Sequence, residues 1–304
     1  MSALVRTGRN ELMTISANFN SDFWSSQINW LERQLNSTIH RIATGQRIIT
    51  AGDDPIGVGI ALHHSARIGG IQSAVINAET SLSILETADT ALVEISDLLL
   101  EMRDLAVNAA NDATLTTANL QTLNSAFESF RDLITSTAEA AKFNGISLLD
   151  GTYATPGKDS QVGPDSGGGN VMSIIMPEIT ADTIAGGTNA LAGVTLSTSA
   201  DALDALSAID DSIDYLDEVF ASIGFQEQRL NTIIDNLYAA QVNIASAKSI
   251  IVDADLASEI SRFASLQIIA QAASSTFGTF DAIKQRVIEI MDKIGANSFA
   301  NSNN

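Results

Sequence analysis

The feature that most constrains this chain is a run of apolar residues at alternating three- and four-residue steps. In the first such segment Leu31 and Leu35 keep the rhythm, and in the second it extends from Ile68 to Ala109. This spacing places apolar side chains on one stripe of an α-helix and is typical of helices that pair in coiled coils. Three further segments follow, at residues 120–141, 206–251 and 263–294. The pattern predicts long paired helices rather than a wide globular core.

The expected helix ends carry capping residues. Gly45 is interpreted as the C-cap of the first helix, and Asp54-Pro55 as the N-cap and first residue of the second. The stripe of the second helix slips near Ala88, which predicts a local change of phase. Asn144-Gly145 is expected to end the third helix.

The helical spacing disappears between residues 144 and 200. Two glycine-rich stretches, at 163–170 and 185–187, bracket an alternating run from Val171 to Met176, which predicts short β-hairpins. We therefore predict a mainly α protein, in which the N- and C-terminal segments form a long antiparallel coiled-coil bundle with a small central β-hairpin region. The expected parts are a first helix in 1–50, a long-helix part of the bundle in 51–143, a short, exposed, β-containing middle in 144–200, a C-terminal bundle helix in 201–255, and a final helix with a polar tail in 256–304.

The negative charge is confined to the middle of the chain. Of the formal net charge of −20, residues 71–200 carry −12 and residues 201–255 carry −9, whereas residues 1–70 carry +1 and residues 256–304 carry none. Packed interfaces tolerate such repulsion less well than exposed surfaces. We therefore expect the two ends to be buried, either together or against other chains. The residues predicted to pack against other subunits are Trp24, Ile28, Leu31, Leu35, Ile42, Phe263, Leu266, Ala270, Ala273 and Phe277.

Several functional classes are not expected. The negative charge argues against a nucleic-acid partner, and the absence of cysteine excludes disulfides and thiol chemistry. Neither a cleavable signal peptide nor an apolar run of about 18 residues is visible, so no membrane insertion is expected. Asp253 and Asp255 lack the other ligands of a calcium loop and fit helix capping better. We predict no catalytic residue, no metal and no cofactor, and therefore no enzyme.

Five motifs, in order, resemble those of bacterial flagellins. Residues 41–61 (RIATGQRIITAGDDPIGVGIA) are similar to the N-terminal motif of that family. Residues 101–110 (EMRDLAVNAA) and 143–151 (FNGISLLDG) resemble its next two motifs. Residues 250–259 (IIVDADLASE) and 266–273 (LQIIAQAA) resemble its C-terminal motifs. One motif alone would be a weak signal, but the ordered set is specific.

The resemblance implies a structural subunit that polymerises into the flagellar filament for motility, as a short variant with a reduced central domain. Segments 1–50 and 256–304 would then be the filament-core helices. The resemblance further implies an extracellular location after export through the flagellar type III apparatus, without a cleaved signal peptide. The implied partners are the chain itself as a helical homopolymer, an export chaperone, and the hook-associated and cap proteins.

One internal segment resembles the region that the vertebrate flagellin receptor recognises. Arg103 and Leu105 match this region, but Glu101 stands where receptor-activating members carry an arginine. The resemblance thus implies a receptor contact at Arg103 and Leu105, whereas the reversed charge at Glu101, which weakens such a contact, leaves activation of the receptor open.

Two alternatives remain open from the sequence. The hook–filament junction protein shares the terminal architecture, but Asp53-Asp54 and the Asp253–Asp255 motif favour flagellin. A flagellin-like surface protein that binds a ligand is the other alternative, and no aromatic cluster or basic pocket in residues 151–200 supports it.

Overall fold

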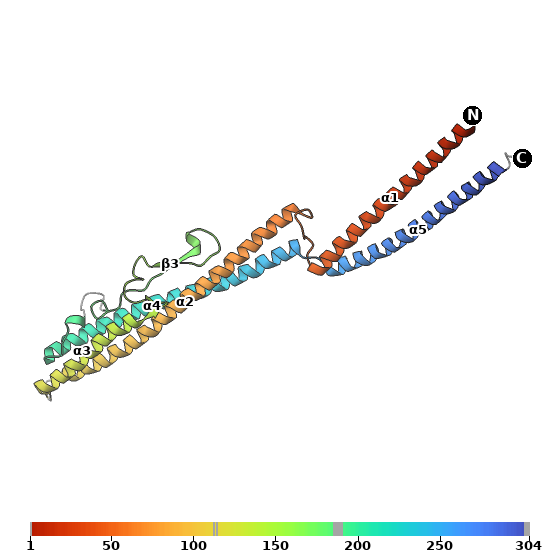
Figure 1. Ribbon diagram of the computed structural model, residues 1–304. Coiled ribbons are helices and arrows are strands. Elements are labelled where there is room, and N and C mark those ends of the chain that lie inside the picture. Colours follow the sequence, from red (N-terminus) through yellow and green to blue (C-terminus); the bar gives the residue numbers. More distant parts are fainter. Residues whose placement is uncertain (1, 112, 114, 185–190, 301–304) are drawn as a thin grey trace. The chain divides into compact units, whose positions relative to one another are not determined.

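The computed structural model describes residues 2–111, 113, 115–184 and 191–300, which divide into two compact units. The terminal unit lies within residues 1–63 and 247–304, and the central unit within residues 64–246. Long helices dominate both, which confirms the mainly α class (Figure 1). No described helix is both long and apolar enough to cross a membrane. The helices are α1 (Ser2–Thr44), α2 (Pro55–Ala109), α3 (Thr117–Ala140), α4 (Ser199–Val252) and α5 (Leu256–Ala300).

Helix α2 buries one apolar stripe in the central unit. The change of phase lies at Ser81, which is only 4% exposed, and not near Ala88 as the sequence suggested. Ser81 Oγ donates to the carbonyl oxygen of Asn77 (2.9 Å) and lies 2.7 Å from Ser160 Oγ, so this buried hydroxyl is satisfied. The buried apolar residues of the stripe are Ile71, Ala74, Val75, Ala78, Leu85, Ala88, Ala91, Leu92, Ile95, Leu99, Met102, Ala106 and Ala109.

Helix α3 ends earlier than the sequence suggested. It begins after Thr116, whose side-chain oxygen accepts the Asn119 N–H (3.3 Å), and it ends at Ala140. The expectation that Asn144-Gly145 ends this helix is wrong. The two residues, with φ of 49° and 80°, form the tight turn between β1 (Lys142–Phe143) and β2 (Ile146–Ser147). Asparagine and glycine tolerate the positive φ that a two-residue hairpin turn requires.

A second hairpin confirms the predicted β-containing middle. Strands β3 (Lys158–Gln161) and β4 (Val171–Ile174) pair antiparallel, with Lys158 opposite Ile174. The first glycine-rich stretch connects them and includes a short 3₁₀ turn, η1 (Gly168–Asn170), and a second such turn, η2 (Leu191–Gly193), follows later. The second glycine-rich stretch, at 185–187, lies outside the described residues.

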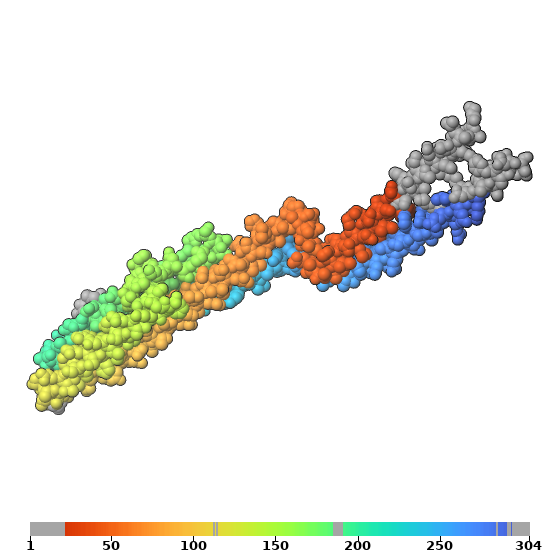
Figure 2. All heavy atoms as spheres, in the orientation of Figure 1, coloured from red at the N-terminus to blue at the C-terminus, as the bar shows by residue number. Residues whose placement is uncertain are grey.

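The middle segment is less exposed than expected. Its charged residues face solvent, but its apolar residues fill the hydrophobic core of the central unit together with α2, α3 and α4. Figure 2 shows this segment, in green, lying directly against the helices. The reason is that three helices with single stripes leave apolar surface uncovered, and the middle covers it. Its buried residues are Leu148, Leu149, Tyr153, Val162, Met172, Ile174, Met176, Ile179, Ala181, Ile184, Leu191 and Leu196.

The β3–β4 hairpin is attached to α2 by specific contacts. Asn77 Nδ2 donates to the carbonyl oxygen of Gln161 (3.0 Å), and an exposed ion pair joins Arg67 to Asp165 (3.5 Å). A Cβ atom on Gly70 would lie 3.1 Å from Pro164 Cβ, so glycine permits the close approach of the hairpin loop. The hairpin is thus part of the central unit and not a free appendage.

Candidate assembly interface

Helices α1 and α5 run antiparallel along each other in the terminal unit (Figure 1). All ten residues predicted to pack at the chain ends are partly or wholly buried within this one chain. Leu31 is 5% exposed and Leu266 is 9% exposed, and the other eight are half-buried. We name this stripe the seam. Thr38 lies on the same stripe of α1, is fully buried, and donates its hydroxyl to the carbonyl oxygen of Gln34 (2.9 Å). Packing of the seam residues against other subunits stays a prediction.

A second set of apolar residues on α1 and α5 remains exposed. Ile268 is 68% exposed and Trp30 is 50% exposed, which is unusual for side chains of this size when they gather on two helices. We name this set the outer apolar face; its members share exposure to solvent, and adjacent ones such as Ile268 and Ile269 show that they lie around the helices rather than along a single stripe. Most of these exposed residues were not predicted from the sequence, because the prediction considered a single apolar stripe on each helix. The signal that could have indicated them is the excess of apolar residues between the stripe positions. The members of the outer apolar face are Phe23, Trp30, Ile39, Leu256, Ile260, Ile268, Ile269, Phe280, Ile283, Val287, Ile288 and Ile290.

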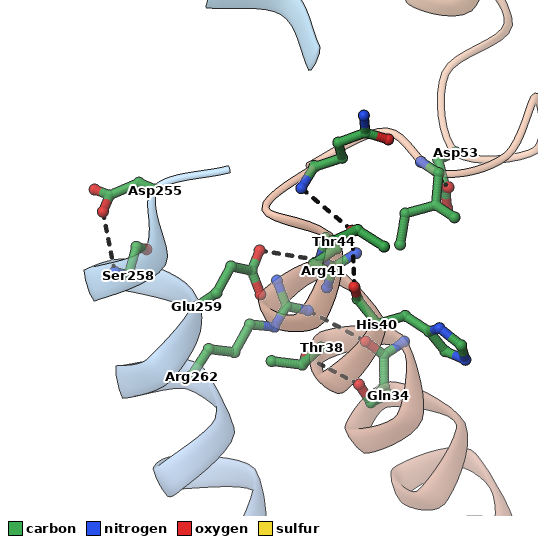
Figure 3. A network of polar contacts seen from close by, with 12 residues as sticks. Gln34, Thr38, His40, Arg41, Thr44, Asp53, Asp255, Ser258, Glu259 and Arg262 are labelled. Carbon is green, nitrogen blue, oxygen red and sulfur yellow. Dashed lines mark hydrogen bonds and ion pairs between the residues drawn. The ribbon is translucent and has the colours of Figure 1, made fainter. Parts of the chain in front are cut away.

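Polar contacts tie α1 to α5 where the two helices begin to pair (Figure 3). Arg41 Nε lies 3.0 Å from Glu259 Oε1, and both side chains are only 15% exposed. Arg262 Nη2 donates to Gln34 Oε1 (3.2 Å) about one turn farther along α5. The sequence showed none of these contacts, since the four residues carry no motif that links them.

The connecting backbone segments also meet in the terminal unit. Gln46 and Asp253 form an antiparallel β-bridge, in which the Arg47 N–H donates to the carbonyl oxygen of Val252 (2.6 Å). The Ala254 N–H donates to the carbonyl oxygen of Gly45 (2.8 Å). Gly45 has a φ of 69°, and its N–H donates to the carbonyl oxygen of Arg41, as expected for a helix C-cap.

The aspartates of the motifs have structural roles here. Asp54 Oδ1 accepts the Gly57 N–H (2.8 Å) and caps α2. Asp255 Oδ1 accepts the Ala257 N–H (3.0 Å) and caps α5, as predicted. Asp53 Oδ2 closes the loop before α2, because it accepts the N–H groups of Thr50 (2.8 Å) and Ile49 (3.1 Å) and the Thr50 hydroxyl. These hydrogen bonds favour the ionised carboxylate.

We expect the loop at 49–53 to open in acid. The Thr50 N–H, followed by the Ile49 N–H and the Thr50 hydroxyl, holds the pKa of Asp53 below its usual value. Because this pKa is lowered on folding, the stabilisation is complete above the unfolded value of about 3.9 and disappears as pH falls through the folded-state pKa. Amide chemical shifts of Ile49 and Thr50, followed from pH 5 to pH 2, should report this opening. The Asp53→Asn variant should lack the transition, and an identical transition in that variant would contradict the assignment.

The residues matched to a receptor site lie in the central unit. Arg103 Nε is 2.8 Å from Asp210 Oδ1 of α4, and this hydrogen bond and charge raise the pKa of Arg103. Leu105 is half-buried against the hydrophobic core. A receptor contact at these two residues stays a prediction, and it would have to compete with Asp210 for the Arg103 guanidinium.

The described residues include no group of three or more His, Asp or Glu side chains that could hold a metal ion. An open groove of about 720 Å³ lies between α2 and α3 and is lined mostly by small residues such as Ser83, Thr87 and Ala91. No imidazole or basic side chain lines this groove.

Comparison with known proteins places the helices in a family. Residues 15–154 match the family model of the bacterial flagellin N-terminal helical region, and residues 206–291 match that of the C-terminal helical region. A flagellin of Halalkalibacterium halodurans is 30% identical over 258 residues, which cover 85% of this chain and 92% of the relative.

Two solved structures are also similar. The crystal structure of Bacillus cereus flagellin is 32% identical and covers 57% of this chain and 94% of its own, with a TM-score of 0.45. A putative flagellar hook-associated protein from Vibrio parahaemolyticus is 21% identical and covers 66% of this chain and 99% of its own, with a TM-score of 0.49. Both TM-scores are below 0.5, so the assignment depends on the sequence matches, which favour flagellin over a junction protein. The chain belongs to the bacterial flagellins, the structural subunits of the flagellar filament.

Proposed function

We propose that this flagellin polymerises through its terminal unit, with the outer apolar face packed against neighbouring subunits. The observation that carries the proposal is the exposure of large apolar side chains on α1 and α5, such as Ile268 (68%) and Ile283 (59%). Burial of one such side chain contributes about 1.5–3 kcal/mol. Several of them together can exceed the entropic cost of association.

The seam has a different role in this proposal. Its residues are already buried or half-buried between α1 and α5 within one chain, for example Leu31 and Leu266. They hold the two helices together, so that both contribute exposed residues to the outer apolar face. Direct contact of some seam residues with a neighbour remains part of the proposal.

The distribution of charge supports the same arrangement. Residues 71–255 carry the entire negative excess, whereas the segments on either side are nearly neutral. Neighbouring copies that approached through their central units alone would repel one another. Contact through the neutral ends lets many copies gather while the acidic residues remain in solvent.

The proposal extends to the path of the protein in the cell. We infer export by the flagellar type III apparatus without a cleaved signal peptide, a chaperone during export, and contacts with hook-associated and cap proteins. The support for these partners is the resemblance of the terminal motifs at 41–61 and 250–273 to flagellins. The partner with the most support is the chain itself, because the outer apolar face needs a covering surface of similar length.

Removal of both ends should abolish assembly. A chain without residues 1–45 and 256–304 keeps α2, α3, α4 and both hairpins. We expect this shortened chain to remain a soluble, helical, acidic monomer under conditions in which the full chain forms filaments. Sedimentation and electron microscopy would measure assembly, and circular dichroism would confirm that the remaining helices are folded. Filaments formed by the shortened chain would refute the assignment of the interface to the terminal unit.

A further inference from the structure

One ion pair lies beside a seam that is apolar apart from Thr38. Arg41 and Glu259 come from opposite helices, and their side chains are each only 15% exposed. Besides Thr38, the positions around them on the seam carry leucine, isoleucine, alanine and aromatic side chains. A charged pair in such a place is not needed to bury apolar surface, so it requires a separate explanation.

The apolar residues of the seam define its register only weakly. Apolar side chains recur on each helix at nearly every turn, and Ala270 and Ala273 are too small to interlock with a single partner. A shift of α5 by one turn, about 5.4 Å, would again set apolar residues against apolar residues. Packing alone therefore discriminates poorly between the observed register and its neighbours.

The polar contacts discriminate strongly. A one-turn shift would separate the 3.0 Å contact between Arg41 and Glu259 and leave both charges largely buried without a partner. It would also break the hydrogen bond from Arg262 to Gln34. A polar residue at a single seam position is a known means of fixing the register of paired helices.

The detailed geometry fits a role in selecting the register better than a role in stability. Glu259 Oε2 is buried and has no hydrogen-bond donor within the described part of the chain. Arg41 Nε is close to Glu259 Oε1, but its N–H is not directed well enough for a hydrogen bond. A pair optimised for stability would satisfy both groups, because an unsatisfied buried polar atom costs free energy.

We propose that the Arg41–Glu259 pair, supported by Gln34 and Arg262, fixes the register of α1 against α5. The register decides which residues of the two helices stand side by side on the outer apolar face. This inference deepens the proposed role of the terminal unit in assembly and rests on it. Arg41 and Glu259 are thus positioning residues, which act on assembly through the alignment of the helices.

The backbone bridge near Gln46 and Asp253 cannot replace this selection. Its hydrogen bonds join main-chain atoms, for example the Arg47 N–H and the carbonyl oxygen of Val252. Main-chain groups are the same at every residue, so a displaced pairing would form equivalent bonds. The side chains of Arg41 and Glu259 distinguish one pairing from the others.

The register can be measured by cross-linking, because the chain contains no cysteine. Gln34→Cys combined with Arg262→Cys reports the observed register, since these side chains are in contact. Two further pairs report a shift of α5 along α1 by about one turn, one for each direction: Gln34→Cys with Ser258→Cys, and Gln34→Cys with Ser265→Cys. All three reporters lack the Gln34–Arg262 hydrogen bond, so a comparison within this set isolates the Arg41–Glu259 pair. A short bifunctional maleimide is applied to the full chain, both free and in filaments.

The decisive variant is Arg41→Met with Glu259→Met, which keeps the volume and removes both charges. We expect the preference for the observed register over the shifted registers to fall at least about tenfold, and filaments to become short or absent. The exchange of charges, Arg41→Glu with Glu259→Arg, should restore both the cross-linking pattern and the filaments. The matched control is Arg67→Met with Asp165→Met, which removes an exposed ion pair of the central unit and should change neither.

The outcomes separate this inference from the proposed function. If the Met–Met variant folds and gives the same cross-linking pattern as the wild type, the inference is overturned. If the Met–Met variant does not fold, the charge-exchange variant decides instead, and its failure to restore the wild-type cross-linking pattern would overturn the inference. Either result would leave the deletion test of the terminal unit unaffected. Filaments from the chain without its ends would overturn the proposed function whatever the cross-links show.

Discussion

Replacement of Ala270 by glutamate is expected to prevent filament formation. Ala270 is half-buried on the stripe of α5 that also carries Phe263, Leu266, Ala273 and Phe277. The longer, charged side chain would lose its hydration without a cation beside it, at a cost of several kcal/mol. Every subunit of the filament carries the change. Since about 1.4 kcal/mol corresponds to a tenfold change in affinity, the affinity of a subunit for the filament should fall more than about 100-fold. Sedimentation, electron microscopy and swimming assays would each measure the loss.

The neighbouring residue provides the control. Gln271→Glu adds the same charge at an exposed position of the same helix, and we expect filaments of normal length. Circular dichroism and urea unfolding of the Ala270→Glu monomer should show that the central unit still folds. Normal filaments from Ala270→Glu would mean that this face of α5 looks onto solvent in the polymer.

Replacement of Phe127 by alanine should have the largest effect on the stability of the central unit. Phe127 lies on α3, is fully buried, and is among the largest such side chains of the hydrophobic core. Its truncation removes apolar contacts and leaves a cavity between α3 and the other helices, which costs about 3–5 kcal/mol. Urea unfolding of the monomer, followed by circular dichroism, should show this loss as a lower midpoint.

Phe225→Ala serves as the matched control, because Phe225 lies on α4 of the same unit but is 71% exposed. We expect its free energy of unfolding to stay within about 0.5 kcal/mol of the original. Equal losses from the two substitutions would show that Phe127 is not at the centre of a packed core.

The sequence predicted those features of the fold that depend on nearby residues. The capping roles of Gly45, Asp54 and Asp255 were predictable because a helix end is decided within one turn. The stripe of α2 was predictable because its period is that of the helix itself. Ser81 escaped notice because a serine reads as polar, although here its hydroxyl finds partners inside the packing.

The features that escaped prediction depend on residues far apart in the chain. Arg262 and Gln34 are separated by 228 positions, so nothing local indicates that they meet. The burial of the middle segment, residues 144–200, was not predicted for the same reason. An alternating pattern shows that one face of a strand is apolar, but it does not show which part of the chain covers that face. At Asn144-Gly145 the signal was local but served two structures, because the dipeptide suits a helix end and a hairpin turn alike.

The bridge between Gln46 and Asp253 makes the pairing of the chain ends conditional on folding elsewhere. Joining points about two hundred residues apart costs roughly 4–5 kcal/mol of conformational entropy when the chain between them is unfolded. In the folded central unit Ile71, Val75 and Leu237 pack together, so only short helical segments separate the bridge from points already held in place. We therefore expect a chain with a disordered centre to bring α1 and α5 together less readily than a folded one. On this expectation, subunits whose central unit has already folded are favoured for addition to the polymer.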